Sequence, residues 1–222
     1  MAKTLENAIR QYKNKRYKQA LDTLLGLNTN PEESPEVAYY LGLCYAKLEN
    51  FEEALMYLEQ VVTSKLNFLQ VYQSRMLLGY IYAVTGRYKL AEFEMNKILK
   101  EGYESAQAYS LLAYTEYEQK KYDDSISHLE KAVEVENGNA NALNSLGYIL
   151  ADTGKDVKKG LDLCKQAVTE DPENPAYLDS LGWAYFKSNN IQEARKFIRK
   201  AMDKAENNKT ISAHMKKVRE YL

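Results

Sequence analysis

The side chains most able to do chemistry are few in this sequence and lie far apart. The 222 residues include two histidines, His128 and His214, and neither lies four residues from another metal ligand in an HExxH arrangement. Cys44 and Cys164 lack the CxxC spacing of zinc and redox sites, and we expect both to be small buried apolar residues. No glycine-rich phosphate loop occurs. We therefore expect no enzyme, no metal and no cofactor, and we interpret His128 as an exposed imidazole.

A recurrent aromatic residue is the feature that points to binding. Tyr80, Tyr114, Tyr148 and Trp183 follow one another at intervals of 34, 34 and 35 residues, and each directly follows a glycine or an alanine. Aromatic side chains are enriched at the centres of protein interfaces. The spacing therefore predicts a position that repeats along the chain, and the aromatic residues there are candidates for contact with a partner protein.

The elements that must position these aromatics repeat with the same period. The small residues that precede them belong to a series of Leu-Gly or Leu-Ala pairs, with intervals of 37, 34, 34 and 35 residues. Apolar residues around each pair are spaced i, i+3, i+4 and i+7, which indicates a helix. A second stripe of small residues follows about twelve positions later and indicates a second helix that packs closely on the first. The two series are Gly42, Gly79, Ala113, Gly147 and Gly182, and then Ala20, Ala54, Ala91, Ser125, Gly160 and Ala194.

These columns resemble the consensus of the tetratricopeptide repeat family, in which Leu-Gly is followed by Tyr, Ala, a large apolar residue and Ala, often with Pro. The stretches Leu143-Asn-Ser-Leu-Gly-Tyr and Asp171-Pro-Glu-Asn-Pro-Ala-Tyr look like the tandem repeats common in bacterial members. The resemblance covers residues 1–208. It implies an all-α, right-handed solenoid of six helix-turn-helix units, at 1–34, 35–71, 72–105, 106–139, 140–174 and 175–208, with a C-terminal capping helix over 209–222.

Two departures from the period are also visible. Three extra residues lie around 68–71, between the second and third units, and the fifth unit needs one inserted residue in its turn. With these allowances we expect thirteen helices and no strand.

The resemblance also implies where a ligand would bind. First helices of such arrays line the concave face, and positions 2, 5, 9 and 12 of each unit form a stripe that is not needed for packing. The competing interpretation is that large residues at position 9 only pack against the neighbouring first helix. The candidate partner-binding residues are Tyr39, Leu43, Gln73, Met76, Tyr80, Gln107, Tyr114, Tyr117, Asn141, Asn144, Tyr148, Trp183 and Phe186.

We therefore expect a non-catalytic scaffold or adaptor that binds a peptide or protein in an aromatic-lined groove. The alternative is a structural module that self-associates through its terminal helices. The chain has 30 basic and 31 acidic residues, which argues against nucleic-acid binding, although both ends are locally basic. The longest apolar run is too short to cross a membrane. We expect a cytoplasmic protein, or a periplasmic or membrane-anchored one if an N-terminal leader has been removed.

Overall fold

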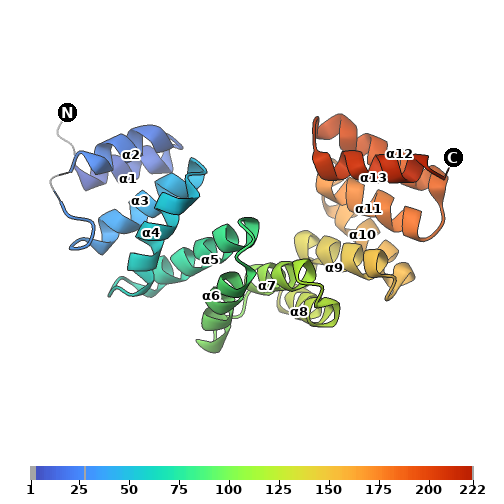
Figure 1. The fold of residues 1–222 in the computed structure, drawn as a ribbon, viewed down its shortest axis with the longest axis horizontal. Helices are drawn as coiled ribbons and strands as arrows, with labels where there is room; N and C mark the ends of the chain where they lie inside the picture. The colour runs from blue at the N-terminus through green and yellow to red at the C-terminus, as the bar shows by residue number, and fades with distance from the viewer. Residues whose placement is uncertain (1–3, 28, 222) are drawn as a thin grey trace. The chain divides into compact units, whose positions relative to one another are not determined.

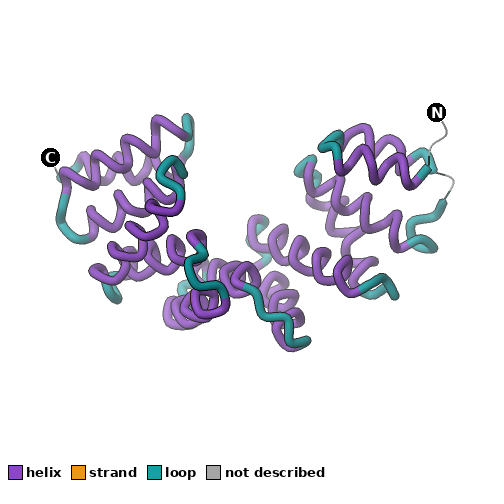
Figure 2. Tube along the Cα trace, turned by 180° about the vertical axis from the view of Figure 1, so that it is seen from behind, coloured by secondary structure: helices purple, strands orange, loops and turns teal. Residues whose placement is uncertain are grey.

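The computed structural model describes residues 4–27 and 29–221, and within these ranges all regular structure is helical. Figure 2 shows the helices joined by short loops. None of the helices described has the length and apolarity to cross a membrane. The expected thirteen helices and the all-α class are confirmed for this part of the chain. In Figure 1 they are α1 (Leu5–Lys13), α2 (Tyr17–Leu25), α3 (Pro35–Lys47), α4 (Phe51–Val62), α5 (Phe68–Val84), α6 (Tyr88–Lys100), α7 (Ala106–Glu118), α8 (Tyr122–Val135), α9 (Ala140–Thr153), α10 (Val157–Glu170), α11 (Pro175–Lys187), α12 (Ile191–Lys204) and α13 (Lys209–Arg219).

Two compact units divide the chain. Residues 1–103 contain α1 to α6, and residues 104–222 contain α7 to α13. Within each unit consecutive helices pack as pairs, and each first helix also packs on the pair that precedes or follows it. The last helix, α13, packs against α12 and α11. Each unit is therefore a short stack of helix pairs, and the second stack ends in a single additional helix.

Small residues lie where the two helices of a pair approach most closely. A Cβ atom on Gly147 would lie 2.8 Å from the carbonyl oxygen of Gly160 and 2.8 Å from Sγ of Cys164. In the α7–α8 pair Ser125 stands at the position equivalent to Gly160, and its hydroxyl donates to the Ala113 carbonyl at 2.7 Å. Both positions are buried, so a larger residue at either would force the two helix backbones apart.

The turn inside each pair uses one left-handed residue. Lys15, Glu49, Gly86, Lys120, Gly154 and Asn189 stand at equivalent places, with φ between 59° and 75°. In five of the six pairs the next amide donates to the carbonyl five residues back, as Lys121 does to Glu116 at 2.9 Å. In the α9–α10 turn the corresponding bond runs from Asp156 to Leu150, six residues back. The extra residue of the fifth unit thus lies in its turn, as the sequence predicts.

The extra residues near position 68 lengthen a helix. They form the first turn of α5, which has 17 residues and begins after Asn67. The Asn67 side chain caps this turn by accepting from the amide of Gln70 at 3.1 Å. The Phe68 ring stacks on that of Tyr103, with centroids 3.8 Å apart.

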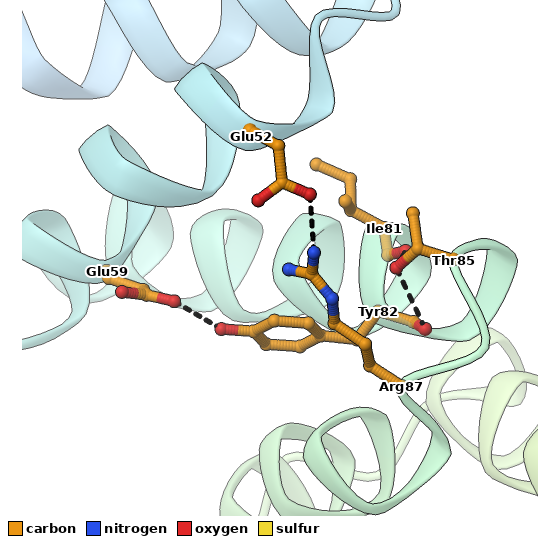
Figure 3. Close-up of polar contacts among 6 residues, drawn as sticks. All are labelled: Glu52, Glu59, Ile81, Tyr82, Thr85 and Arg87. Carbon is orange, nitrogen blue, oxygen red and sulfur yellow. Dashed lines mark hydrogen bonds and ion pairs between the residues drawn. The ribbon is translucent and has the colours of Figure 1, made fainter.

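Polar contacts attach α4 to α5 and to the turn between α5 and α6 (Figure 3). The Tyr82 hydroxyl donates to Oε1 of Glu59, and Arg87 pairs with Glu52. Burial, together with the hydrogen bond to Glu59, raises the pKa of Tyr82 above its ordinary value. At the end of α5 the Thr85 hydroxyl donates to the Ile81 carbonyl at 2.7 Å.

The close contact at Gly147 predicts that even alanine is too large there. Alanine is the better helix former by about 1 kcal/mol, but its methyl group would press on a backbone oxygen that cannot rotate away. We expect Gly147→Ala to lower the free energy of unfolding by about 1–3 kcal/mol in urea titrations. Gln166→Ala, at an exposed site of α10, is the control and should change it little. An equally stable Gly147→Ala protein would contradict the packing described.

The left-handed turn predicts a stabilising substitution. Lys120 is exposed and has φ 62°, a conformation that disfavours side chains with a Cβ atom by about 1–2 kcal/mol. We expect Lys120→Gly to raise the free energy of unfolding by about 1 kcal/mol, since part of the gain is offset by the freer unfolded chain. Ser127→Gly, at an exposed position inside α8, should instead destabilise by about 1 kcal/mol. A loss of stability in Lys120→Gly would disprove this account of the turn.

Candidate functional site

In the N-terminal unit, a hollow of about 630 Å³ lies beside α3 and α5 and includes several of the predicted residues. Tyr39 is 6% exposed, its hydroxyl donates to Oε1 of Gln73, and its ring packs edge-on against Tyr40. Tyr80 is 49% exposed. Tyr39 therefore offers a partner little surface, whereas Tyr80 offers much. The hollow is lined by Tyr12, Tyr39, Leu43, Ala46, Lys47, Glu49, Phe51, Gln73, Leu77 and Tyr80; half-buried Met76 is not among them.

In the C-terminal unit, a cavity of about 380 Å³ brings four of the predicted residues together. Tyr114 and Tyr117 reach it from α7, and Asn144 and Tyr148 reach it from α9. Its lining is Ser110, Tyr114, Tyr117, Glu118, Leu129, Asn144, Ser145, Tyr148, Ile149, Pro175, Ala176, Asp179, Ser180, Asn208, Thr210, Ile211 and His214. Gln107, Asn141, Trp183 and Phe186 are predicted residues that do not line it.

The carboxylate of Asp152 holds two aromatic side chains in place beside this cavity. Trp183 donates its indole N–H to Oδ1 at 2.9 Å, and Tyr117 donates its hydroxyl to Oδ2 at 2.7 Å. Nζ of Lys187 lies 3.6 Å from Oδ1 and balances the charge. Because both polar ends are bonded within the protein, Trp183 and Tyr117 present mainly their ring surfaces.

One of the amides expected to bind a peptide already has a partner on the neighbouring helix. Oδ1 of Asn141 accepts from the Tyr177 hydroxyl at 2.7 Å, which links α9 to α11. Gln107 is exposed on α7. Oδ1 of Asn144 is buried and has no hydrogen-bond partner. Among these amides, Asn144 is the one with an acceptor still to be satisfied.

The capping helix α13 forms a wall of the cavity, which the sequence analysis missed. Nδ1 of His214 lies 2.8 Å from Oδ2 of Asp179, and the imidazole stacks on the Trp183 indole with centroids 4.1 Å apart. The side chains of Asp179 on α11 and His214 on α13 are 9% and 11% exposed. The available signal was that His214 shares one helical face with Ile211, Met215 and Val218.

His128 differs from the expectation of an exposed imidazole. It is half-buried, its Nδ1 lies 2.8 Å from Oε2 of Glu116, and its ring stacks on that of Tyr109. The reason is that Glu116 occupies a buried position where the second, third, fifth and sixth units have Tyr or Leu, so its carboxylate needs a polar neighbour.

The two cysteine thiols are placed unfavourably for nucleophilic catalysis. Both cysteines are buried, as expected, and burial raises the pKa of the Cys44 and Cys164 thiols to about 12. Thiols with such a pKa hold little of the nucleophilic thiolate. Within the described residues, no three His, Cys, Asp or Glu side chains gather in a way that would hold a metal ion.

Comparisons with protein families agree with the repeat pattern. A family model described as tetratricopeptide repeat matches residues 5–66 and 110–175, and a second model of the same description matches 176–207. A TPR repeat-containing protein of Pseudomonas aeruginosa is 34% identical over 77 residues, which make up 35% of this chain. The match spans 13% of that relative's length.

Solved structures share the fold at low sequence identity. YrrB, described as a TPR protein with an unusual peptide-binding site, is 20% identical with a TM-score of 0.57, over 90% of this chain and 97% of its own. MamA of Desulfovibrio magneticus RS-1 is 22% identical with a TM-score of 0.63, over 78% and 97%. A chain of the Cut9–Hcn1 assembly of the APC/C is 13% identical with a TM-score of 0.78, over 96% and 42%.

The half-buried Tyr148 of the cavity predicts a loss of stability in alkali. Burial, with the charges of Asp152 and Asp179 nearby, raises the pKa of Tyr148 to about 12 from an ordinary value of 10.0. The unfolded chain therefore loses this proton first, and the contribution to stability present below pH 10 disappears as the pH rises toward 12.

We expect Tyr148→Phe to lose less stability between pH 10 and 12 than the unchanged protein, by at most about 1.4 kcal/mol per pH unit. Urea unfolding at several pH values measures the slope. Tyr80→Phe, a change at an exposed ring, is the control. Identical slopes for Tyr148→Phe and the unchanged protein would contradict the burial of this hydroxyl.

Proposed function

We propose that this chain, which belongs to the tetratricopeptide repeat family, is a non-catalytic scaffold that binds a peptide or an extended segment of another protein. The observation that carries the proposal is the cavity of the C-terminal unit. It combines exposed aromatic surface from Tyr114 with the unsatisfied acceptor of Asn144. Concave sites with apolar walls and a few convergent polar groups are typical of binding sites.

The arrangement of the first helices suits a chain-like ligand. Tyr114, Tyr148 and Trp183 stand at the same repeat position on α7, α9 and α11, and α9 packs against both of the other two helices. A segment that crosses these helices would meet an aromatic ring on each. Tyr148 and Trp183 are half-buried and held by neighbours, so they lose little conformational freedom when a ligand binds. The described peptide site of YrrB gives a precedent for this fold.

The sequence also predicts that Tyr80 of the N-terminal unit belongs to the same binding surface as Tyr114, Tyr148 and Trp183. This stays a prediction. So does the participation of Leu43, Gln73, Met76 and Phe186. The C-terminal cavity is the part of the surface on which the proposal rests.

Panning a library of random linear peptides against the full chain tests the proposal. We expect enriched peptides to lose about 2 kcal/mol of binding free energy, roughly 30-fold in Kd, with the Tyr114→Ala variant. Tyr114 is 42% exposed, so the variant should remain folded. Phe93→Ala removes an aromatic side chain from α6 that is 54% exposed, and it should leave the affinities unchanged.

Two results would count against the proposal. The library might yield no specific peptide, or the enriched peptides might bind Tyr114→Ala as tightly as the unchanged chain. Sedimentation in the same buffer examines the self-association alternative: a dimer that dissociates on dilution, with no peptide bound, would favour that function instead.

A further inference from the structure

Two residues that line the C-terminal cavity each carry a buried oxygen that lacks a hydrogen-bond donor. One is Oδ1 of Asn144 on α9, and the other is Oδ1 of Asp179 on α11. Asp179 uses its second oxygen to accept from His214, so half of a carboxylate that is 9% exposed remains unsatisfied. Buried polar groups without partners lower stability, and they are commonly completed by water or by a ligand.

The charges around the cavity favour a cation. Among the described residues that line it, the carboxyl groups are those of Asp179 and Glu118, and none is a lysine or an arginine. Because a carboxylate can only accept, His214 donates from Nδ1 to Asp179. A positive group in the cavity would gain electrostatic energy and also supply the missing donors.

The walls suit a planar cation. Tyr114 and Tyr148 line the cavity beside the acceptors, and a guanidinium group packs well on aromatic faces. Its several N–H groups can reach acceptors on two helices at once, whereas an ammonium group is a compact point charge.

We propose that the C-terminal cavity receives an arginine side chain of the bound segment, with its guanidinium group donating to Asn144 Oδ1 and Asp179 Oδ1. This proposal rests on the proposed function, because it names the chemistry of the partner at the same site. The chain would then bind segments that contain arginine, and Tyr114 and Tyr148 would form the walls of the arginine pocket.

Titration with N-acetyl-arginine amide, followed by the NMR signals of the Trp183 indole and the His214 imidazole, tests the pocket directly. We expect saturable shifts, with binding at least tenfold tighter than for N-acetyl-citrulline amide, which has the same shape but no charge. Nα-acetyl-lysine amide, which keeps its side-chain ammonium group, should bind more weakly than the arginine probe. Equal binding of the arginine and citrulline probes, or no shift with either, would overturn the proposal.

Two variants test the acceptors. Asp179→Asn should lower the affinity for the arginine probe at least tenfold and remove its advantage over citrulline. Since that variant also alters the contact with His214, Asn144→Leu provides a second test. It removes a buried oxygen that has no partner, so we expect an unchanged or higher midpoint of thermal unfolding together with a loss of arginine binding. An Asn144→Leu protein that binds the arginine probe as before would contradict the proposal.

The two proposals fail in different ways. If the peptide library yields binders that depend on Tyr114 but carry no basic residue, and the arginine probe produces no shifts, the scaffold function stands and the arginine pocket falls. If the probe binds but no peptide does, the cavity recognises the cation and the wider proposal of segment binding is wrong.

Discussion

The contact between the two helices of a pair is the constraint on which the rest of this structure depends. At Gly147 and Gly160 the backbones are so close that one helix has its oxygen where a side chain of the other would be. This contact uses one face of each first helix and leaves the adjacent face free of packing within the pair. Tyr114, Tyr148 and Trp183 follow directly after the small residues of this contact, so the same turn of helix sets both the packing and the surface. The residues that pack a helix pair and the aromatic residues that we propose for binding are therefore neighbours in the sequence.

Features that repeat were predictable from the sequence, and features that occur once were not. The Leu-Gly columns predicted the helices, and the inserted residue of the fifth unit lies in its turn as expected. The same register identified Tyr114, Tyr117, Asn144 and Tyr148, which the structure brings to one cavity. The pair of Asp179 and His214 joins a repeated helix to α13, whose sequence lacks the Leu-Gly pair, so no column could reveal it. Burial was also misjudged where one residue type departs from its column, as with His128 beside Glu116.

Asp152 shows how a single carboxylate can organise a surface built from aromatic rings. It accepts from the Trp183 indole and from the Tyr117 hydroxyl, which come from different repeats. The Tyr117 ring in turn packs edge-on against Tyr148, and the Trp183 ring packs against Phe186 and His214. The rings are therefore fixed relative to one another before any ligand arrives. Large amphipathic side chains that are fixed in this way combine extensive contact area with a small loss of entropy.

The wall that α13 contributes has a consequence for how such an array can change over time. Repeat proteins lengthen or shorten by gaining or losing whole units, and each added unit copies the surface of its neighbours. The cavity is not copied in this way, because Ile211 and His214 belong to α13, which lies outside the six helix pairs. Duplication of an internal repeat would lengthen the array and still leave one such cavity, beside α13. The number of repeats and the number of these sites are therefore free to evolve independently.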